Sequence, residues 1–319
     1  MIEISHLVKR YGTKFAVDDI SFSVGYGEIV GFLGPNGAGK STTMNILTGY
    51  LSSTSGTAKV GGIDVLEAPY EAKKLIGFLP EQPPLYVDMK VDEYLHFVYD
   101  LKKCKLDREK HLAEVCAVTK ITDVRHRLIK NLSKGYKQRV GIAQALIGDP
   151  KVLIFDEPTV GLDPKQIIEI RNLIRTLGED HTVILSSHIL SEVQAVADRI
   201  VIINEGKIVA DEKTEDISRA VEDGRRYSVK IAGPQREVLA LLKAVPGVVY
   251  AETAGERELD SFTYRIESEP GVDIRKPLFF ALAERGFAIL GLEAAGVSLE
   301  DVFMKLTLSD AKKNSSKKR

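Results

Sequence analysis

Several features that mark particular classes of protein are scarce in this chain. Its 319 residues include two cysteines, Cys104 and Cys116, and no C-x-x-C pair. A metal site built on cysteine is therefore not expected, and both thiols are interpreted as buried or idle. The formal net charge is −1. This value argues against a protein that holds nucleic acid by bulk electrostatics, so we expect no nucleic-acid partner.

Long apolar runs are also missing. No segment approaches the roughly 18 apolar residues of a membrane-spanning helix, and no charged-then-apolar signal pattern opens the sequence. We therefore expect a cytoplasmic protein that lies on the inner face of the cell membrane through a partner. Because the composition is ordinary for a globular protein and the length suits about two domains, packed cores are expected.

The most informative segment present is Gly34–Thr42, which fits the pattern G-x-x-x-x-G-K-[ST]. Glycines let successive backbone N–H groups turn toward a phosphate, and a following helix adds the positive end of its dipole. Lys40 is suited to neutralise the β- and γ-phosphates, and the Ser41 hydroxyl is suited to bind Mg²⁺. The expected nucleotide contacts are Gly34, Pro35, Asn36, Gly37, Ala38, Gly39, Lys40, Ser41 and Thr42.

The flanks of this segment decide between a phosphate site and a chance glycine-rich turn. Residues 28–33 predict a buried strand, and residues 41–50 predict a helix. The motif requires that strand–loop–helix order. The sequence therefore predicts a binding site for a nucleoside triphosphate.

A second group of candidate site residues follows the apolar run 152–155. Asp156 and Glu157 come directly after this predicted buried strand. A carboxylate at such a strand end can hold Mg²⁺ through water, and Glu157 is placed to polarise an attacking water. An acidic pair after a strand is more often a solvated strand end. Here the apolar run and the preceding phosphate loop favour function.

Strand and helix signals alternate from residue 1 to about residue 211, which is typical of α/β architecture. We expect a first domain over residues 1–215, with inserted helices at about 87–145. A charged linker is expected at 216–225. In the inserted region, Val91, Leu95 and Val98 recur at helical spacing.

The remaining sequence predicts a smaller α+β domain over residues 226–308. Its elements follow the order β-α-β-β-α-β, which suggests a ferredoxin-like fold. Tyr227, Phe262 and Tyr264 either fill the core of this domain or form an interface, and we favour the core. Residues 309–319 are polar and basic and are expected to form a disordered tail.

A third motif, Leu132–Arg139, lies between the two site constellations, with Ser133 as a predicted helix cap. In this order the motifs resemble the nucleotide-binding subunits of ATP-binding cassette (ABC) transporters. The resemblance covers roughly residues 1–211, about two-thirds of the chain. It implies the P-loop ABC ATPase fold with an inserted helical subdomain, and ATP hydrolysis with Mg²⁺ as cofactor.

The resemblance assigns roles to residues around the nucleotide. It implies that Tyr11 stacks on adenine, that Asp156 is linked to magnesium and that Glu157 is the catalytic glutamate. His188 matches the switch histidine at the γ-phosphate. Gln82 matches a glutamine that touches Mg²⁺ and senses a membrane partner. Without the family, Tyr11 and His188 would be interpreted as structural residues and Gln82 as an ordinary loop residue.

Other roles involve a second subunit. Ser133 and Gly135 match signature residues that contact the γ-phosphate held by the opposite subunit, and Asp163 matches a loop that links the two active sites. The signature departs from the usual Leu-Ser-Gly-Gly-Gln because Lys134 replaces a glycine and Tyr136 replaces the glutamine. A lysine can still favour a phosphate electrostatically. No catalytic position is altered, so active hydrolysis is expected.

The implied partners are a second ATPase subunit, arranged head to tail as a homodimer, and a separate transmembrane permease that docks at about Gln82–Val98. The segments Leu79–Tyr86 and Ser298–Phe303 resemble ABC-2 type exporter ATPases, a group that includes multidrug, sodium-export and gliding-motility-associated proteins. The alternative is a soluble ABC ATPase that acts on ribosomes or nucleic acid. The cargo cannot be predicted from these residues.

Overall fold

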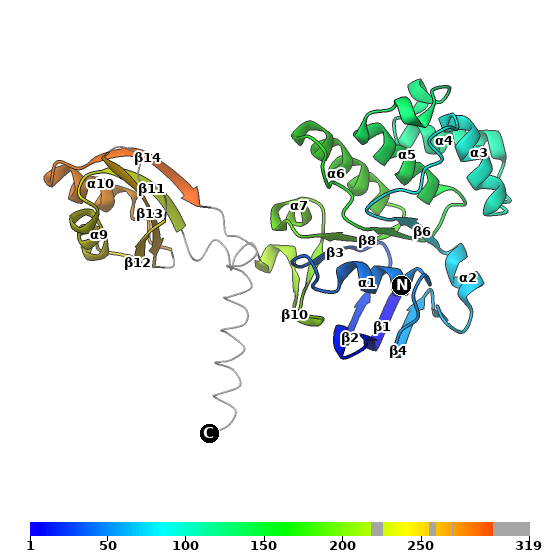
Figure 1. Cartoon of the computed structure of the whole chain (residues 1–319), viewed down its shortest axis with the longest axis horizontal. Coiled ribbons are helices and arrows are strands. Elements are labelled where there is room, and N and C mark those ends of the chain that lie inside the picture. Colours follow the sequence, from blue (N-terminus) through cyan, green and yellow to red (C-terminus); the bar gives the residue numbers. More distant parts are fainter. Residues whose placement is uncertain (218–225, 255–259, 270, 296–319) are drawn as a thin grey trace. The chain divides into compact units, whose positions relative to one another are not determined.

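The computed structural model describes residues 1–217, 226–254, 260–269 and 271–295 (Figure 1). The chain divides into two compact units, Met1–Thr214 and Glu215–Arg319. Most of the expected linker, the basic tail at 309–319 and the segment Ser298–Phe303 lie outside the described residues.

The core of the first unit is a six-stranded sheet in the order β10-β9-β3-β8-β7-β6. Its strands are β3 (Ile29–Leu33), β6 (Ile76–Leu79), β7 (Val152–Phe155), β8 (Thr182–Ser187), β9 (Arg199–Asn204) and β10 (Lys207–Lys213). All neighbouring pairs are parallel except β9 and β10, which form a hairpin. Every residue of β3 and β7 is buried, as expected for parallel strands covered on both faces. The carboxyl ends of the parallel strands therefore meet at one edge of the sheet.

A second sheet packs beside the first. It is antiparallel, in the order β2-β1-β4-β5, and consists of β1 (Ile2–Tyr11), β2 (Lys14–Val24), β4 (Ser55–Val60) and β5 (Ile63–Asp64). Residues of both sheets and of α1 (Lys40–Leu47) share one apolar core. Phe22 of β2 stacks on Phe32 of β3 with ring centroids 5.4 Å apart. Helix α1 is therefore held between the sheets directly after the phosphate-loop motif.

The inserted helices form a separate lobe of the first unit (Figure 1). The elements are α3 (Val91–Leu101), α4 (Arg108–Val118), η1 (Thr122–Val124), η2 (Ile129–Asn131) and α5 (Lys134–Leu146), and α2 (Pro69–Lys74) precedes them. Val91, Leu95 and Val98 form a buried stripe, in agreement with their spacing. In addition, Tyr94 donates a hydrogen bond to Gln144 (3.0 Å), and burial raises its pKa to about 12.

Two further helices pack on the sheet, α6 (Pro164–Gly178) and α7 (Leu190–Gln194). Asp163 caps α6 by accepting a hydrogen bond from Gln166 N (2.9 Å). Helix α7 packs so closely on β3 that a Cβ placed at Gly31 would lie 1.8 Å from Val193 Cγ1. Glycine in mid-strand therefore permits this approach.

The second unit follows the element order β11 (Arg226–Ala232), α9 (Gln235–Ala244), β12 (Val248–Thr253), β13 (Ser261–Ser268), α10 (Arg275–Glu284) and β14 (Ala288–Ala295). Its antiparallel sheet has the order β12-β13-β11-β14. Tyr227 and Tyr264 are buried in the core of this unit, and Phe262 packs against that core, which favours the core interpretation over an interface. The ferredoxin-like assignment stays a prediction. No helix among the described residues is long and apolar enough to cross a membrane.

Candidate functional site

The loop between β3 and α1 depends on its glycines. Gly37 and Gly39 have φ values of +80° and +114°, a region that side chains with a Cβ rarely adopt. A Cβ at Gly39 would lie 2.5 Å from Ala16 O, and one at Gly34 would lie 2.3 Å from Ile203 O. The loop therefore adopts its curve against β2 and β9 because these positions have no side chain.

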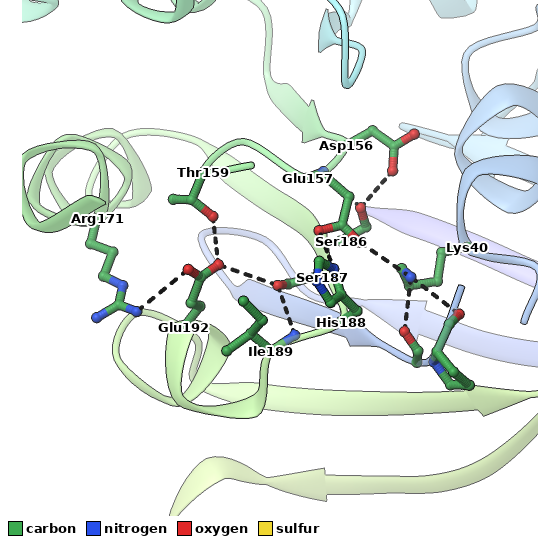
Figure 2. A network of polar contacts seen from close by, with 12 residues as sticks. Lys40, Asp156, Glu157, Thr159, Arg171, Ser186, Ser187, His188, Ile189 and Glu192 are labelled. Carbon is green, nitrogen blue, oxygen red and sulfur yellow. Dashed lines mark hydrogen bonds and ion pairs between the residues drawn. The ribbon is translucent and has the colours of Figure 1, made fainter. Parts of the chain in front are cut away.

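Lys40, the first residue of α1, is buried with 5% exposure. Its ammonium donates hydrogen bonds to Gly34 O (2.8 Å) and Pro35 O (3.3 Å). The same nitrogen lies 3.2 Å from Glu157 Oε1 (Figure 2). Although it forms this ion pair, Glu157 Oε1 has no hydrogen-bond partner within the described part of the chain. A buried carboxylate oxygen thus keeps its capacity to accept a proton or a hydrogen bond.

The two carboxylates predicted from the sequence lie at the end of β7. Ser186 Oγ donates a hydrogen bond to Asp156 Oδ1 (2.5 Å) and accepts one from Glu157 N (2.9 Å). Glu157 has a φ of +49°, an uncommon conformation for a residue other than glycine and one that often occurs at functional sites. His188 follows β8, and its Nδ1 lies 3.0 Å from Glu157 Oε2 (Figure 2). Glu157 is therefore held between a lysine and a histidine.

These groups face a cavity of about 420 Å³, a suitable size for a small ligand. The predicted site residues that line it are Tyr11, Asn36, Gly37, Gly39, Lys40, Ser41, Thr42, Glu157 and His188. Tyr11 is 51% exposed at the end of β1, which suits a ring available for stacking better than a core residue. The structure therefore brings the phosphate loop, Glu157, His188 and Tyr11 to one cavity.

Some cavity residues were not found from the sequence. They are Lys14, Ala16, Glu81 and Val160. Lys14 lies opposite Tyr11 across the tight turn between β1 and β2, and that turn is the sequence signal that could have identified it. Glu81 lines the cavity, whereas its neighbour Gln82 is exposed and does not.

The residues that are expected to act at the site of the opposite subunit do not line this cavity. Ser133 caps α5 by accepting a hydrogen bond from Tyr136 N (3.4 Å). Gly135 is buried against the side chain of Gln166 in α6. Asp163 is exposed at the start of α6. Lys134, one of the two signature departures, directs its ammonium toward Gly161.

The second departure, Tyr136, makes a local contact. Its hydroxyl donates a hydrogen bond to Asp123 Oδ2 (2.9 Å), and this bond raises the pKa of the tyrosine. The side chain thus ties α5 to η1.

The donor set fits Mg²⁺. Ser41 lines the cavity, whereas Asp156, at the end of β7, carries a carboxylate that is not among the lining residues. Both are hard oxygen donors of the kind that Mg²⁺ prefers. No group of three or more His, Cys, Asp or Glu suited to a metal occurs among the residues that the structure describes.

Comparison with known proteins agrees with the geometry. Residues 17–160 match the family model "ABC transporter". The chain is 31% identical to the bacitracin transport ATP-binding protein BcrA of Bacillus licheniformis, over 96% of this chain and 97% of that protein. It is 39% identical to the lantibiotic transport ATP-binding protein SrtF of Streptococcus pyogenes, over 70% of this chain and 95% of that protein.

A solved structure extends the comparison. It is the dimeric structure of a post-hydrolysis state of the ATP-binding cassette MJ0796 bound to ADP and Pi, with a TM-score of 0.61 and 26% sequence identity. The match covers 67% of this chain and 99% of that chain.

Proposed function

This chain belongs to the ABC transporter ATP-binding proteins, and we propose that it is the ATPase subunit of an ABC-2 type exporter. As a member of the family it binds and hydrolyses ATP. The export assignment is supported by full-length similarity to a bacitracin transport ATP-binding protein and by similarity to a lantibiotic transport ATP-binding protein. The alternative role on ribosomes or nucleic acid has no support from these relatives. We propose that the subunit acts on the inner face of the membrane.

The observation that carries the catalytic assignment is the position of Glu157. One of its oxygens lies 3.2 Å from Lys40 Nζ and the other 3.0 Å from His188 Nδ1. With Lys40 on the phosphates, Glu157 is free to accept a hydrogen bond from water and to orient it toward the γ-phosphate. His188, on the same side of the cavity, would stabilise the charge of the transferred phosphoryl group.

We propose that Ser41 and Asp156 hold Mg²⁺ together with the nucleotide. The ion would supply positive charge to the phosphate oxygens. Ser186 assists because its hydroxyl donates a hydrogen bond to Asp156 Oδ1. Ser186 Oγ also accepts a hydrogen bond from the backbone N–H of Glu157. One serine thus holds the Asp156 carboxylate and the backbone of Glu157.

A second copy of the chain completes the proposed site. Ser133, Gly135 and Asp163 do not line the cavity with the phosphate loop. In a head-to-tail dimer, the signature of each copy would meet the phosphate loop of the other. ATP would then contact both copies and favour the closed state by differential affinity. The dimeric structure of the MJ0796 cassette supports an assembly of two copies.

We further propose that the segment Gln82–Val98 docks the membrane subunit. Tyr86 is 54% exposed, and its ring lies 5.3 Å from that of Phe97 in an edge-on contact. Beneath this aromatic surface, Tyr94 bonds Gln144, and Gln144 Nε2 donates to Phe78 O in β6 (3.1 Å). Because β6 leads to the loop that contains Glu81 and Gln82, movement of the docked partner would reach the cavity.

The export assignment is tested by isolating the complex. Tagged Glu157→Gln protein, purified from detergent-solubilised native membranes with ATP and Mg²⁺, is expected to bring a polytopic membrane protein in stoichiometric amount. Lys40→Ala is the control that should fail to stabilise an ATP-dependent complex. Recovery of ribosomes or nucleic acid instead would contradict the exporter assignment. In size-exclusion chromatography with its membrane partner, Glu157→Gln should run as an ATP-dependent dimer.

A further inference from the structure

Besides Asp156 and Glu157, a further buried carboxylate lies near the catalytic residues. Glu192, on α7, is 8% exposed and does not line the nucleotide cavity. Its Oε2 accepts a hydrogen bond from Thr159 Oγ1 (2.5 Å) and a longer one from Ser187 Oγ (3.4 Å). Figure 2 shows this carboxylate between the segments that follow β7 and β8. Burial of a carboxylate is costly unless its hydrogen bonds are satisfied, so this arrangement calls for an explanation.

The two hydroxyls belong to the segments that carry the catalytic side chains. Thr159 lies two residues after Glu157, and Ser187 lies directly before His188. Ser187 Oγ also accepts a hydrogen bond from Ile189 N (3.1 Å), which fixes the turn on both sides of His188. One carboxylate oxygen therefore fixes the spacing between the two segments. That spacing determines whether Glu157 and His188 can meet at 3.0 Å.

A third segment reaches the same carboxylate. Arg171 Nη2 of α6 lies 3.9 Å from Glu192 Oε1. Arg171 Nε is buried and has no hydrogen-bond partner in the described ranges. Helix α6 begins directly after Asp163, the residue assigned to the dimer contact. Glu192 thus contacts the segments that follow β7 and β8 and faces α6.

Helix α7, which carries Glu192, is itself packed against the central sheet. Val193, the neighbour of Glu192, packs against Gly31 of β3, and β3 leads directly into the phosphate loop. A side chain on such a rigid support can hold two loops in register more precisely than contacts within the loops.

We propose that Glu192 is a positioning residue for ATP hydrolysis, which acts through Thr159 and Ser187 on Glu157 and His188. This inference rests on the proposed roles of those two catalytic residues. Glu192 touches no substrate, so its loss should reduce the catalytic rate and leave ATP binding unchanged. Small displacements of catalytic groups have large effects on rate.

The first test is a matched set of variants in the full-length chain. Glu192→Ala is expected to lower kcat about tenfold while KM for ATP stays within about twofold. Glu192→Gln, which keeps one acceptor oxygen, should lie between this variant and the wild type. Glu212→Ala, at an exposed position of β10, is the control and should leave kcat unchanged. An unchanged kcat for Glu192→Ala would overturn the proposal, as would a rise in KM alone.

A second pair keeps the proposal testable if Glu192→Ala does not fold. Thr159→Val removes the hydroxyl, whereas Thr159→Ser keeps it. We expect the valine variant to lose kcat and the serine variant to retain it, with nucleotide affinity equal in both. Equal kcat in the two variants would contradict the role of the 2.5 Å hydrogen bond.

Combining Thr159→Val with Glu192→Ala separates positioning from independent structural effects. If both act through one hydrogen bond, the double variant should be no slower than the slower single variant, within about twofold. If the reductions of kcat in the two single variants multiply in the double variant, the role of Glu192 is merely structural. A parallel loss of nucleotide affinity and thermal stability would show the same. Glu157→Gln, measured alongside, identifies failure of the proposed function. If Glu157→Gln hydrolyses ATP at the wild-type rate, the catalytic assignment is wrong. If Glu157→Gln is inactive while Glu192→Ala has a wild-type rate, only the positioning role of Glu192 is refuted.

Discussion

Lys40 Nζ and Glu157 Oε1 lie 3.2 Å apart, with side-chain exposures of 6% and 7%. The proposed phosphate-binding cation and the proposed catalytic base therefore form one buried ion pair. Such a pair compensates two charges that would each be costly to bury alone. A phosphate would compete with Glu157 for the ammonium, so nucleotide binding and the freedom of Glu157 to act on water are coupled through Lys40.

Removal of the ammonium should weaken ATP binding. Lys40→Ala is expected to raise the dissociation constant of ATP by roughly 10- to 100-fold, because charge-assisted hydrogen bonds are lost. A fluorescent ATP analogue titrated against the full-length chain measures this. Lys213→Ala, at an exposed position of β10, is the matched control. Wild-type affinity in Lys40→Ala would refute the assigned role.

The same ion pair gives a stability prediction. Lys40→Ala leaves the Glu157 carboxylate buried without its cation, which should lower the free energy of unfolding by about 3 kcal/mol. Adding Glu157→Gln to Lys40→Ala removes the uncompensated charge and should restore most of that loss. Chemical denaturation of the two variants and the wild type checks this. A double variant less stable than Lys40→Ala would contradict the argument.

Close packing of α7 on β3 can be tested at Gly31. A Cβ at this position would lie 1.8 Å from Val193 Cγ1, so Gly31→Ala should destabilise the first unit by about 1–3 kcal/mol. Val193→Ala in the same chain creates space and should recover part of the loss. Gly291→Ala, whose Cβ would lie at an ordinary contact distance of 3.9 Å from Lys230 Cβ, should be nearly neutral in thermal unfolding. Equal effects at the two glycines would contradict the packing argument.

His111 makes the stability of the helical lobe depend on pH. Its Nε2 accepts a hydrogen bond from Gly148 N (3.0 Å), which requires a neutral ring. Burial, with a smaller contribution from Lys102, lowers its pKa, although Asp149 and Glu114 act in the opposite direction. The unfolded chain, with a histidine pKa near about 6.5, then binds more protons than the folded chain. The contribution of His111 to the free energy of unfolding is therefore fully present above about pH 6.5. It decreases as the pH falls toward the lower pKa of the folded state.

Urea unfolding at several pH values isolates this effect. His111→Gln cannot titrate, so the stability of wild type relative to this variant should decrease between about pH 7.5 and about pH 5.5. His126→Gln, at an exposed position, should run parallel to wild type. A constant difference between wild type and His111→Gln would refute the prediction.

Local patterns predicted much of the site because the chemistry lies in consecutive residues. The phosphate loop requires glycines at fixed spacing, and the structure gives Gly37 and Gly39 positive φ values. Likewise, Asp156 and Glu157 follow an apolar run that forms β7, and Ser133 and Asp163 cap their helices. The ABC ATPase fold could be predicted because these local motifs occur in one order.

Tertiary contacts explain what the sequence did not reveal. Glu192 is an ordinary helical glutamate until β7, β8 and α6 are folded around it. Which of Glu81 and Gln82 faces the cavity depends on the course of the loop after β6. The sequence shows that residues 81, 82 and 192 are acidic or polar, but it does not show which way their side chains point. Lys14 likewise joins the site through its register with Tyr11 across the β1–β2 turn.

The signature residues Ser133 and Gly135 do not line the nucleotide cavity of their own chain, and this leads to a prediction about assembly. Ser133 is exposed at the start of α5, so Ser133→Glu should fold, because a negative charge is favourable at a helix N-terminus, and should repel a phosphate in the opposite copy. Lys40→Ala disables the phosphate loop instead. When either variant is present alone, every loop–signature pairing that two of its copies can make contains a defective partner. ATPase assays of the separately purified variants should therefore show little activity.

Mixing the two variants should restore activity. In a mixed dimer, one site combines the Lys40→Ala loop with the Ser133→Glu signature, and the other combines a native loop with a native signature. Random exchange makes half of the dimers mixed, so about one quarter of the wild-type sites should be intact. A mixture of Lys40→Ala with Lys40→Ala/Ser133→Glu is the control and should stay inactive. Failure to recover activity despite demonstrated subunit exchange would contradict a site shared between two identical copies, because only a site shared in this way can be rebuilt from two defective chains.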